Sequence, residues 1–152
     1  MREILFKAKA INRIEGKEYR TNYKNGDWVY GLLSKPHYKF GNYDFTAEMT
    51  NTDLVSGIEV DHETLGQFTG LTDKNGVKIF EGDVIQCKLA VGTVTYQTGV
   101  DDNFTSGFVV LWTNKRYLRQ ELGFWAVKRD ITVIGNIYDN PELLGGDDNA
   151  TD

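Results

Sequence analysis

Cysteine, histidine and long apolar runs are nearly absent from this chain of 152 residues, and each absence excludes a class of protein. A single cysteine, Cys87, permits no internal disulfide. Since His37 and His62 are the only histidines, a zinc site built from cysteine and histidine lacks the ligands that it requires. No stretch approaches the roughly 18 apolar residues of a membrane span, and the first residues are too charged for a signal peptide. We therefore expect a cytoplasmic protein that uses no metal or other cofactor.

Positive charge is also in short supply, because the formal net charge is −5. Non-specific nucleic-acid binding depends mainly on lysine and arginine that neutralise phosphates, so an acidic chain disfavours this function for the protein as a whole. One stretch, residues 112–129, nevertheless combines basic and aromatic residues. It predicts either a solvated face of strands or, as an alternative function, a nucleic-acid-binding patch made by Lys115, Arg116, Tyr117, Arg119, Lys128 and Arg129.

Proline is rare and glycine common, with two and sixteen residues, and aromatic residues make up 12% of the chain. This composition favours short strands joined by tight turns. Within it, Glu81-Gly82-Asp83 is similar to the entry turn of SH3-like barrels, in which glycine permits a tight turn and aspartate caps it. We predict a mainly β protein with an N-terminal β-hairpin region over 1–55, an SH3-like small barrel over 56–144 and a disordered acidic tail over 145–152.

The N-terminal region carries one strong hairpin signal. Glu18–Tyr23 and Trp28–Leu33 contain aromatic and β-branched residues at strand spacing, and Asn25-Gly26 lies between them. This dipeptide takes positive φ more easily than any other, as tight hairpin turns require. The sequence thus predicts that the two segments pair with each other. A separate short strand is predicted at Ile4–Ala8.

Aromatic residues recur every two or three positions between Lys35 and Thr52, where Pro36 and Gly41 interrupt the strand pattern. The pattern indicates an edge hairpin or a clamped loop. Its rings are expected first of all to pack on the domain, as aromatic rings usually do, and alternatively to form an interaction surface. The candidate interaction residues are Tyr38, Phe40, Tyr43 and Phe45.

Beyond residue 56 the pattern predicts several more strands, which include Val84–Leu89, Thr93–Gln97, Phe108–Trp112, Phe124–Val127 and Thr132–Ile137. Helical signals are confined to Arg116–Leu122 and Pro141–Leu144, and a turn is expected at Asp73–Gly76. The predicted core consists of Phe6, Trp28, Tyr30, Leu71, Ile79, Phe80, Val84, Ile85, Val110, Trp125, Val133, Ile134 and Ile137.

Few residues are arranged for catalysis. Glu81 and Asp83 have the chemistry of an acid–base pair, but carboxylates in such a turn are expected to accept hydrogen bonds from backbone amides. Asp61-His62-Glu63 carries three potential metal ligands, yet neighbouring residues on a strand point to opposite faces and cannot converge on one ion. We therefore predict no catalytic, cofactor-binding or metal-binding residues and no enzymatic activity.

Three blocks of sequence, spread over nearly the whole chain, share a pattern of glycine, Asn-Gly and aromatic residues. They are Met1–Ile4 with Phe6–Ala8 and Asp27–Gly31; Glu63–Thr64 with Gly66–Leu71, Asp73–Gly76 and Ile79–Val84; and Val133–Leu144. In this order the blocks resemble the YopX protein family of phages and prophages. The resemblance implies a mostly β structure with an SH3-like barrel and members that form homo-oligomers. It implies no catalytic residues, because the family has no agreed activity.

These observations lead to a functional hypothesis with two alternatives. We expect a phage or prophage accessory protein in the bacterial cytoplasm that self-associates and acts by binding a host or phage protein. The first alternative is a nucleic-acid-binding barrel module that uses residues 112–129. The second is a small enzyme whose site the sequence does not reveal.

Overall fold

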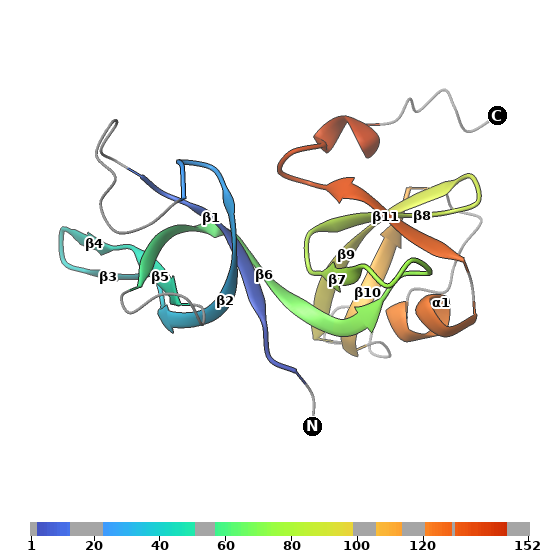
Figure 1. Cartoon of the computed structure of the whole chain (residues 1–152), viewed down its shortest axis with the longest axis horizontal. Helices are drawn as coiled ribbons and strands as arrows, with labels where there is room; N and C mark the ends of the chain where they lie inside the picture. Colours follow the sequence, from blue (N-terminus) through green and yellow to red (C-terminus); the bar gives the residue numbers. More distant parts are fainter. Residues whose placement is uncertain are drawn as a thin grey trace. The chain divides into compact units, whose positions relative to one another are not determined.

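The computed structural model describes residues 3–12, 23–50, 57–98, 106–113, 121–128 and 130–145. The chain divides into two compact units, Met1–Gln67 and Phe68–Asp152. The division falls inside the long strand β6 (Ile58–Thr72), whereas the sequence pattern predicts a boundary after residue 55. One continuous strand thus serves both units (Figure 1). The predicted acidic tail lies outside the described residues from position 146 onwards.

Four antiparallel strands form the sheet of the first unit. They are β1 (Phe6–Ala10), β2 (Trp28–Lys35), β5 (Ala47–Thr50) and the first part of β6. Because β1 pairs with both β2 and β6, the ladder of pairings returns to its first strand. Alternate residues of each strand point inward, as the period of a strand dictates. The buried core of this unit consists of Ala8, Ala10, Val29, Ala47, Met49, Ile58 and Val60.

The Asn25-Gly26 turn is present, and the described strand beside β2 at this turn is β1, so the pairing expected with Glu18–Tyr23 stays a prediction. Gly26 has φ 89°, and its N–H donates to the carbonyl of Ala10 at 2.8 Å. The strand that pairs with β2 across this turn is β1, with Val29 opposite Ala8. Residues 18–22 lie outside the described residues. A turn signal identifies where the chain reverses, whereas the pairing depends on which strand presents a matching inward face.

Tyr30 shows the same dependence on the facing strand. It was predicted in the core but is 48% exposed, because Val29 and Gly31 on either side of it are the residues that point inward. Aromatic character alone does not tell which side of a strand is buried.

The second unit contains a four-stranded antiparallel sheet of order β10-β9-β8-β11. Its strands are β8 (Asp83–Cys87), β9 (Ala90–Thr98), β10 (Ser106–Trp112) and β11 (Ile131–Asn136). The short strand β7 (Lys78–Phe80) pairs with the end of β6. A helix, α1 (Leu122–Lys128), and a 3₁₀ helix, η1 (Pro141–Leu143), complete the unit. The fold class is therefore mainly β, as predicted, and the SH3-like barrel stays a prediction.

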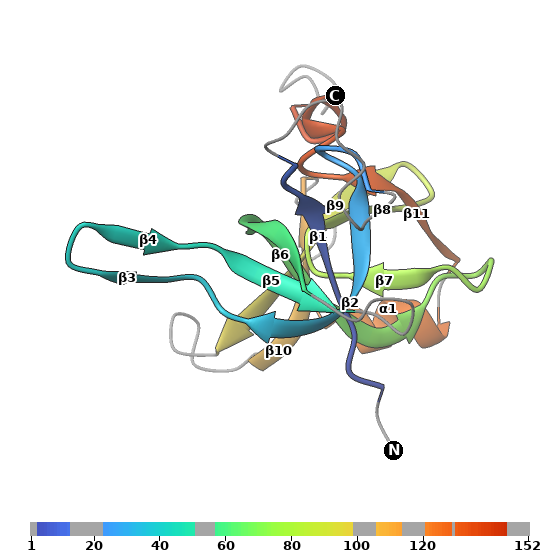
Figure 2. The same cartoon turned by 60° about the vertical axis from the view of Figure 1, so that its left-hand side comes forward.

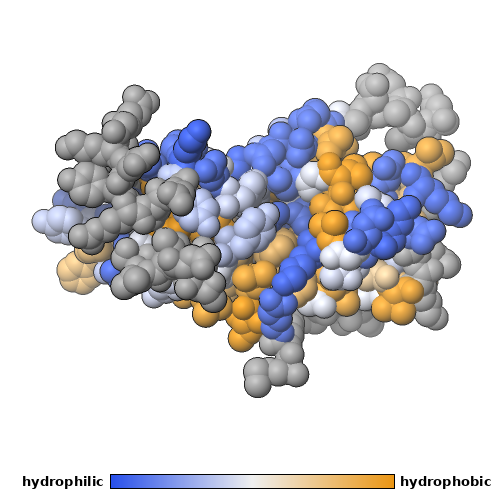
Figure 3. Space-filling view, in the orientation of Figure 1, coloured by the Kyte–Doolittle hydropathy of each residue, from blue (hydrophilic) through white to orange (hydrophobic). Residues whose placement is uncertain are grey.

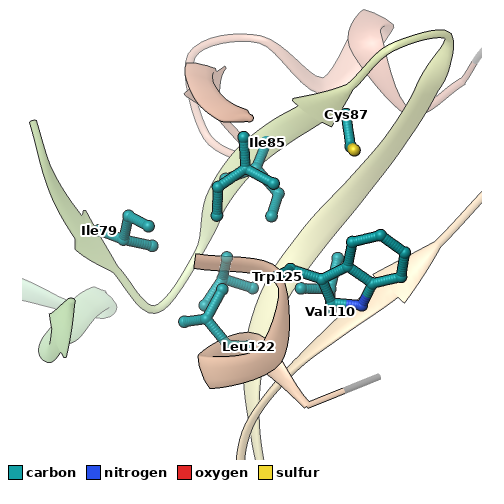
Figure 4. Close-up of a cluster of buried hydrophobic side chains, with 8 residues drawn as sticks. Ile79, Ile85, Cys87, Val110, Leu122 and Trp125 are labelled. Carbon is teal, nitrogen blue, oxygen red and sulfur yellow. The ribbon is translucent and has the colours of Figure 1, made fainter. Parts of the chain in front are cut away.

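Residues Phe124–Val127, predicted as a strand, belong to helix α1. Leu122 and Trp125 lie three positions apart, so on a helix both point to one side, and both are buried in the core (Figure 4). The aromatic and β-branched residues of this segment favour a strand locally, but burial on one helical face decides its structure. The remaining buried residues of this core are Ile79, Ile85, Cys87, Val94, Val110 and Ile131.

One of the two expected helical segments is confirmed, and most of the other is not described. The helical turn expected at Pro141–Leu144 is the 3₁₀ helix η1, which has proline at its start. The other, at Arg116–Leu122, lies outside the described residues up to position 120. Leu122, its last residue, is the first residue of α1.

Candidate functional site

The aromatic segment forms a separate two-stranded hairpin of β3 (Tyr38–Phe40) and β4 (Tyr43–Phe45). Gly41 has φ 60°, the positive value that a two-residue hairpin turn of type II′ needs at its first central position. Among the described strands, β3 and β4 pair only with each other. The hairpin extends away from the sheet formed by β1, β2, β5 and β6 (Figure 2).

The register of the hairpin places all four rings on one side. Tyr38 lies opposite Phe45 and Phe40 lies opposite Tyr43. Directly opposed residues, and residues two apart on one strand, share a face of the ribbon. We call these four side chains the aromatic face. Lys39 and Asp44, which also oppose each other, lie on the reverse side.

The aromatic face is open to solvent. Tyr38 is 50% exposed, Phe40 75%, Tyr43 70% and Phe45 41%. The rings of Tyr38 and Phe45 stack on each other with their centroids 4.4 Å apart. The favoured expectation, that these rings pack on the domain, is therefore wrong, since each ring is at least 41% exposed. In Figure 3, pale orange hydrophobic residues lie at the surface at the far left, where Figure 1 places β3 and β4.

Two histidines from distant parts of the sequence meet at the base of the hairpin. The His37 and His62 rings are stacked, with centroids 3.7 Å apart and planes inclined by 7°. His37 Nε2 also contacts Asp44 Oδ1 on β4. Sequence reasoning missed this pair, because no local pattern connects the β2–β3 turn with β6. Among the described residues, no group of three potential ligands is arranged to hold a metal ion.

A bulge in β6 explains why His62 points outward. Lys7 pairs with Gly66 and Lys9 with Asp61, so β6 carries extra residues at this point of the ladder. Thr64 Oγ1 accepts a hydrogen bond from Lys9 N–H at 2.8 Å and donates one to Asp61 O at 2.7 Å. Thr64 thereby replaces the missing ladder contact and holds the bulge in place.

In the Glu81-Gly82-Asp83 turn, the aspartate bonds to a backbone amide as expected. Asp83 is buried, and its carboxylate accepts a hydrogen bond from the Phe80 N–H at 2.8 Å. Gly82 has φ 91°, a conformation that residues with side chains rarely adopt. The Asp83 carboxylate is thus buried and bonded within the turn, so it is not open to a substrate as an acid–base pair with Glu81 would require.

Asp73 organises the second turn and one edge strand. Its carboxylate accepts hydrogen bonds from the N–H groups of Asn75 at 2.8 Å, Val77 at 2.9 Å and Val133 at 3.0 Å. Burial alone raises the pKa of this carboxyl. The three donors and the nearby charge of Lys74 outweigh burial and hold the pKa below its ordinary value. The Asp73 turn thereby covers part of the outer edge of β11.

The alternative nucleic-acid patch is only partly described. Lys115, Arg116, Tyr117, Arg119 and Arg129 lie outside the described residues, and Lys128 is the last residue of α1. The Trp125 ring is buried and meets the Trp112 ring edge to face at 5.1 Å. A ring in such a core contact offers no open face on which a base could stack.

These features define a mainly β protein with an exposed aromatic hairpin in its first unit. Comparison with protein families identifies it further: the family model described as "YopX protein" matches residues 18–145. The chain belongs to the YopX protein family, which confirms the resemblance found in the three sequence blocks.

Comparisons with individual proteins add less. The structure is similar to the "Crystal structure of protein EF1440 from Enterococcus faecalis", with 22% sequence identity and a TM-score of 0.49. The similarity covers 93% of this chain and 98% of that one. No curated protein matches the sequence. None of the helices in the described ranges is long and apolar enough to span a membrane.

Proposed function

We propose that this protein is a non-enzymatic phage or prophage accessory protein of the bacterial cytoplasm. In this proposal it self-associates and acts by binding a host or phage protein. The observation that carries the proposal is the aromatic face, on which four neighbouring rings are exposed on one side of a hairpin. Membership of the YopX protein family supports the phage origin.

The size of the aromatic face supports a binding role. An aromatic side chain buries roughly 150–250 Å² in a core, so four half-exposed rings leave on the order of 400 Å² of apolar surface open. Contiguous apolar patches of this order on soluble proteins commonly mark interaction sites. A partner that covers the rings would remove this surface from water, which favours association.

The hairpin also offers backbone groups to a partner. A two-stranded ribbon has unpaired N–H and C=O groups along both outer edges, and β3 and β4 have no further strand neighbour among the described strands. An extended segment of a partner can add to such an edge and place alternate side chains against the rings. This is the mode of binding that we propose for the aromatic face.

For the second unit we infer an SH3-like small barrel. The inference is supported by the Glu81-Gly82-Asp83 turn, where Gly82 has positive φ and Asp83 bonds back to Phe80. The sheet β10-β9-β8-β11, with β7 alongside β6, supplies the short antiparallel strands that such a barrel needs.

The test is an affinity capture of the tagged protein from bacteria that express it during phage infection, at low and moderate salt. We expect a specific protein to be retained at both salts, and we expect Phe40→Ser/Tyr43→Ser to lose it. Lys39→Ser, on the reverse side of the same hairpin, is the matched control and should retain the partner. Light scattering on the purified protein measures self-association.

Two outcomes would contradict the proposal. A monomer that retains no protein would argue against both parts of it. Nucleic acid held only at low salt, without any protein, would instead favour the alternative patch around Arg116 and Arg119, because phosphate contacts weaken steeply with salt.

A further inference from the structure

The base of the aromatic hairpin is tied to the sheet of the same unit through a pair of ionisable rings. His37 precedes β3 directly, and His62 lies on the outward bulge of β6. Their parallel stack at 3.7 Å joins these two segments. We propose that His37 and His62 form a pH-sensitive latch that holds the hairpin to β6 at neutral pH and releases it on mild acidification.

The stack is the contact that depends on charge. His37 Nε2 can donate to the Asp44 carboxylate both when the ring is charged and when it is neutral with its proton on Nε2. The contact with Asp44 therefore survives a change in protonation. Two neutral rings, or one neutral and one charged ring, can also stack. Two charged rings with centroids 3.7 Å apart repel each other, so the second proton opposes the latch.

Other charged groups surround the pair on each neighbouring strand. Asp61 and Glu63 flank His62 on β6, and Asp61 already accepts a hydrogen bond from the Glu63 N–H. Further charged groups on the described strands are Lys39 opposite Asp44, the Lys35–Glu48 ion pair at 3.2 Å between β2 and β5, and Lys9 opposite Asp61.

The direction of the effect follows from proton binding. Histidine is the side chain whose charge ordinarily changes between about pH 5 and 8. Like charges on both rings would lie 3.7 Å apart only in the stacked state, so falling pH shifts the population towards release. The latch deepens the proposed function, on which its biological meaning rests, because it controls how rigidly the aromatic face is presented.

NMR on the full chain tests the latch without any partner. We expect the ¹⁵N–¹H heteronuclear NOE of residues 38–45 to be high at pH 7.5 and to fall at pH 5.5, while the amides of β1 and β2 stay rigid. His62→Phe keeps a stacking ring without charge, so its hairpin should stay ordered at both pH values. His62→Ala removes the stack and should leave the hairpin mobile at both. His62 is exposed, so neither variant should unfold the unit.

Two results would overturn the latch: identical hairpin values at both pH values in the wild type, or a fall in His62→Phe as large as in the wild type. The proposal that a partner binds the aromatic face is tested by a different result. If Phe40→Ser/Tyr43→Ser still captured the partner while the hairpin responded to pH, the latch would stand and the aromatic face would not be the docking surface. If the variants abolished capture but pH had no effect, only the latch would fall.

Discussion

The ring of Tyr138 lies against Gly82, where a β-carbon would come within 3.2 Å of its Cε2 atom. The N–H of Ile137 also donates to the carbonyl of Gly82 at 2.9 Å. Two of the sequence blocks typical of the family, far apart along the chain, therefore meet at this turn. Their glycine and tyrosine are complementary, because the missing side chain of one makes room for the ring of the other.

Gly82→Val should destabilise the protein by about 1–3 kcal/mol and lower its melting temperature, because valine tolerates a positive φ poorly and its side chain meets Tyr138. Thermal denaturation measures the change. Gly123→Ala is the matched control, since its added methyl group contacts nothing within 4 Å and alanine favours a helix. An unchanged melting temperature in Gly82→Val would show that the turn does not require glycine.

Asp73→Asn should remove part of the acid sensitivity of folding. The folded-state pKa of Asp73 lies below the unfolded-state value of about 3.9. The ionised carboxylate therefore contributes to the stability of the fold above that pH, and this contribution is lost as the pH falls through the folded-state pKa. We expect the variant to be about 1–3 kcal/mol less stable at pH 7, and the gap to narrow below about pH 4.

Urea denaturation between pH 7 and pH 2.5 measures this gap. Glu142→Gln, at an exposed position of η1, is the control and should follow the wild type at every pH. A constant difference between Asp73→Asn and the wild type across this range would contradict the role given to the ionised carboxylate.

Gly135→Ala should destabilise the second unit for a steric reason alone. A β-carbon there would lie 2.5 Å from Asn140 Oδ1, the atom that accepts a hydrogen bond from the Asn136 N–H. Such overpacking costs about 1–3 kcal/mol. Because the clash involves Asn140, the double variant with Asn140→Ala should lose less than the sum of the two single changes. If thermal denaturation showed that the stability losses of the two single variants simply add, the clash with Asn140 would not be the cause.

Thr64→Val should loosen the β6 bulge. Valine has the shape of threonine but leaves the Lys9 N–H without its acceptor, which costs about 1–2 kcal/mol at this buried position. Chemical denaturation measures the loss, and Thr72→Val at an exposed end of β6 should change stability by less than about 0.5 kcal/mol. Equal effects of the two substitutions would show that the hydroxyl does not support the bulge.

Local turn chemistry was predicted well because it depends on a few adjacent residues. Gly26, Gly76 and Gly82 all have the positive φ that their turns require, and Pro141 begins a helical turn. The candidate residues of the aromatic face were also found from their spacing alone. The favoured expectation that those rings pack on the domain was wrong, since spacing tells which residues share a face but not what covers it.

The sequence by itself determined the fold class, the family and the positions of the turns, because composition and short-range conformational preferences act within a few residues. Only the tertiary structure decided that β1 pairs with β2, that Phe124–Val127 is helical and that His37 stacks on His62. Each of these depends on contacts between distant segments. Such contacts are stabilised by the surface that two segments bury against each other, and the sequence of either segment alone does not show which surface that is.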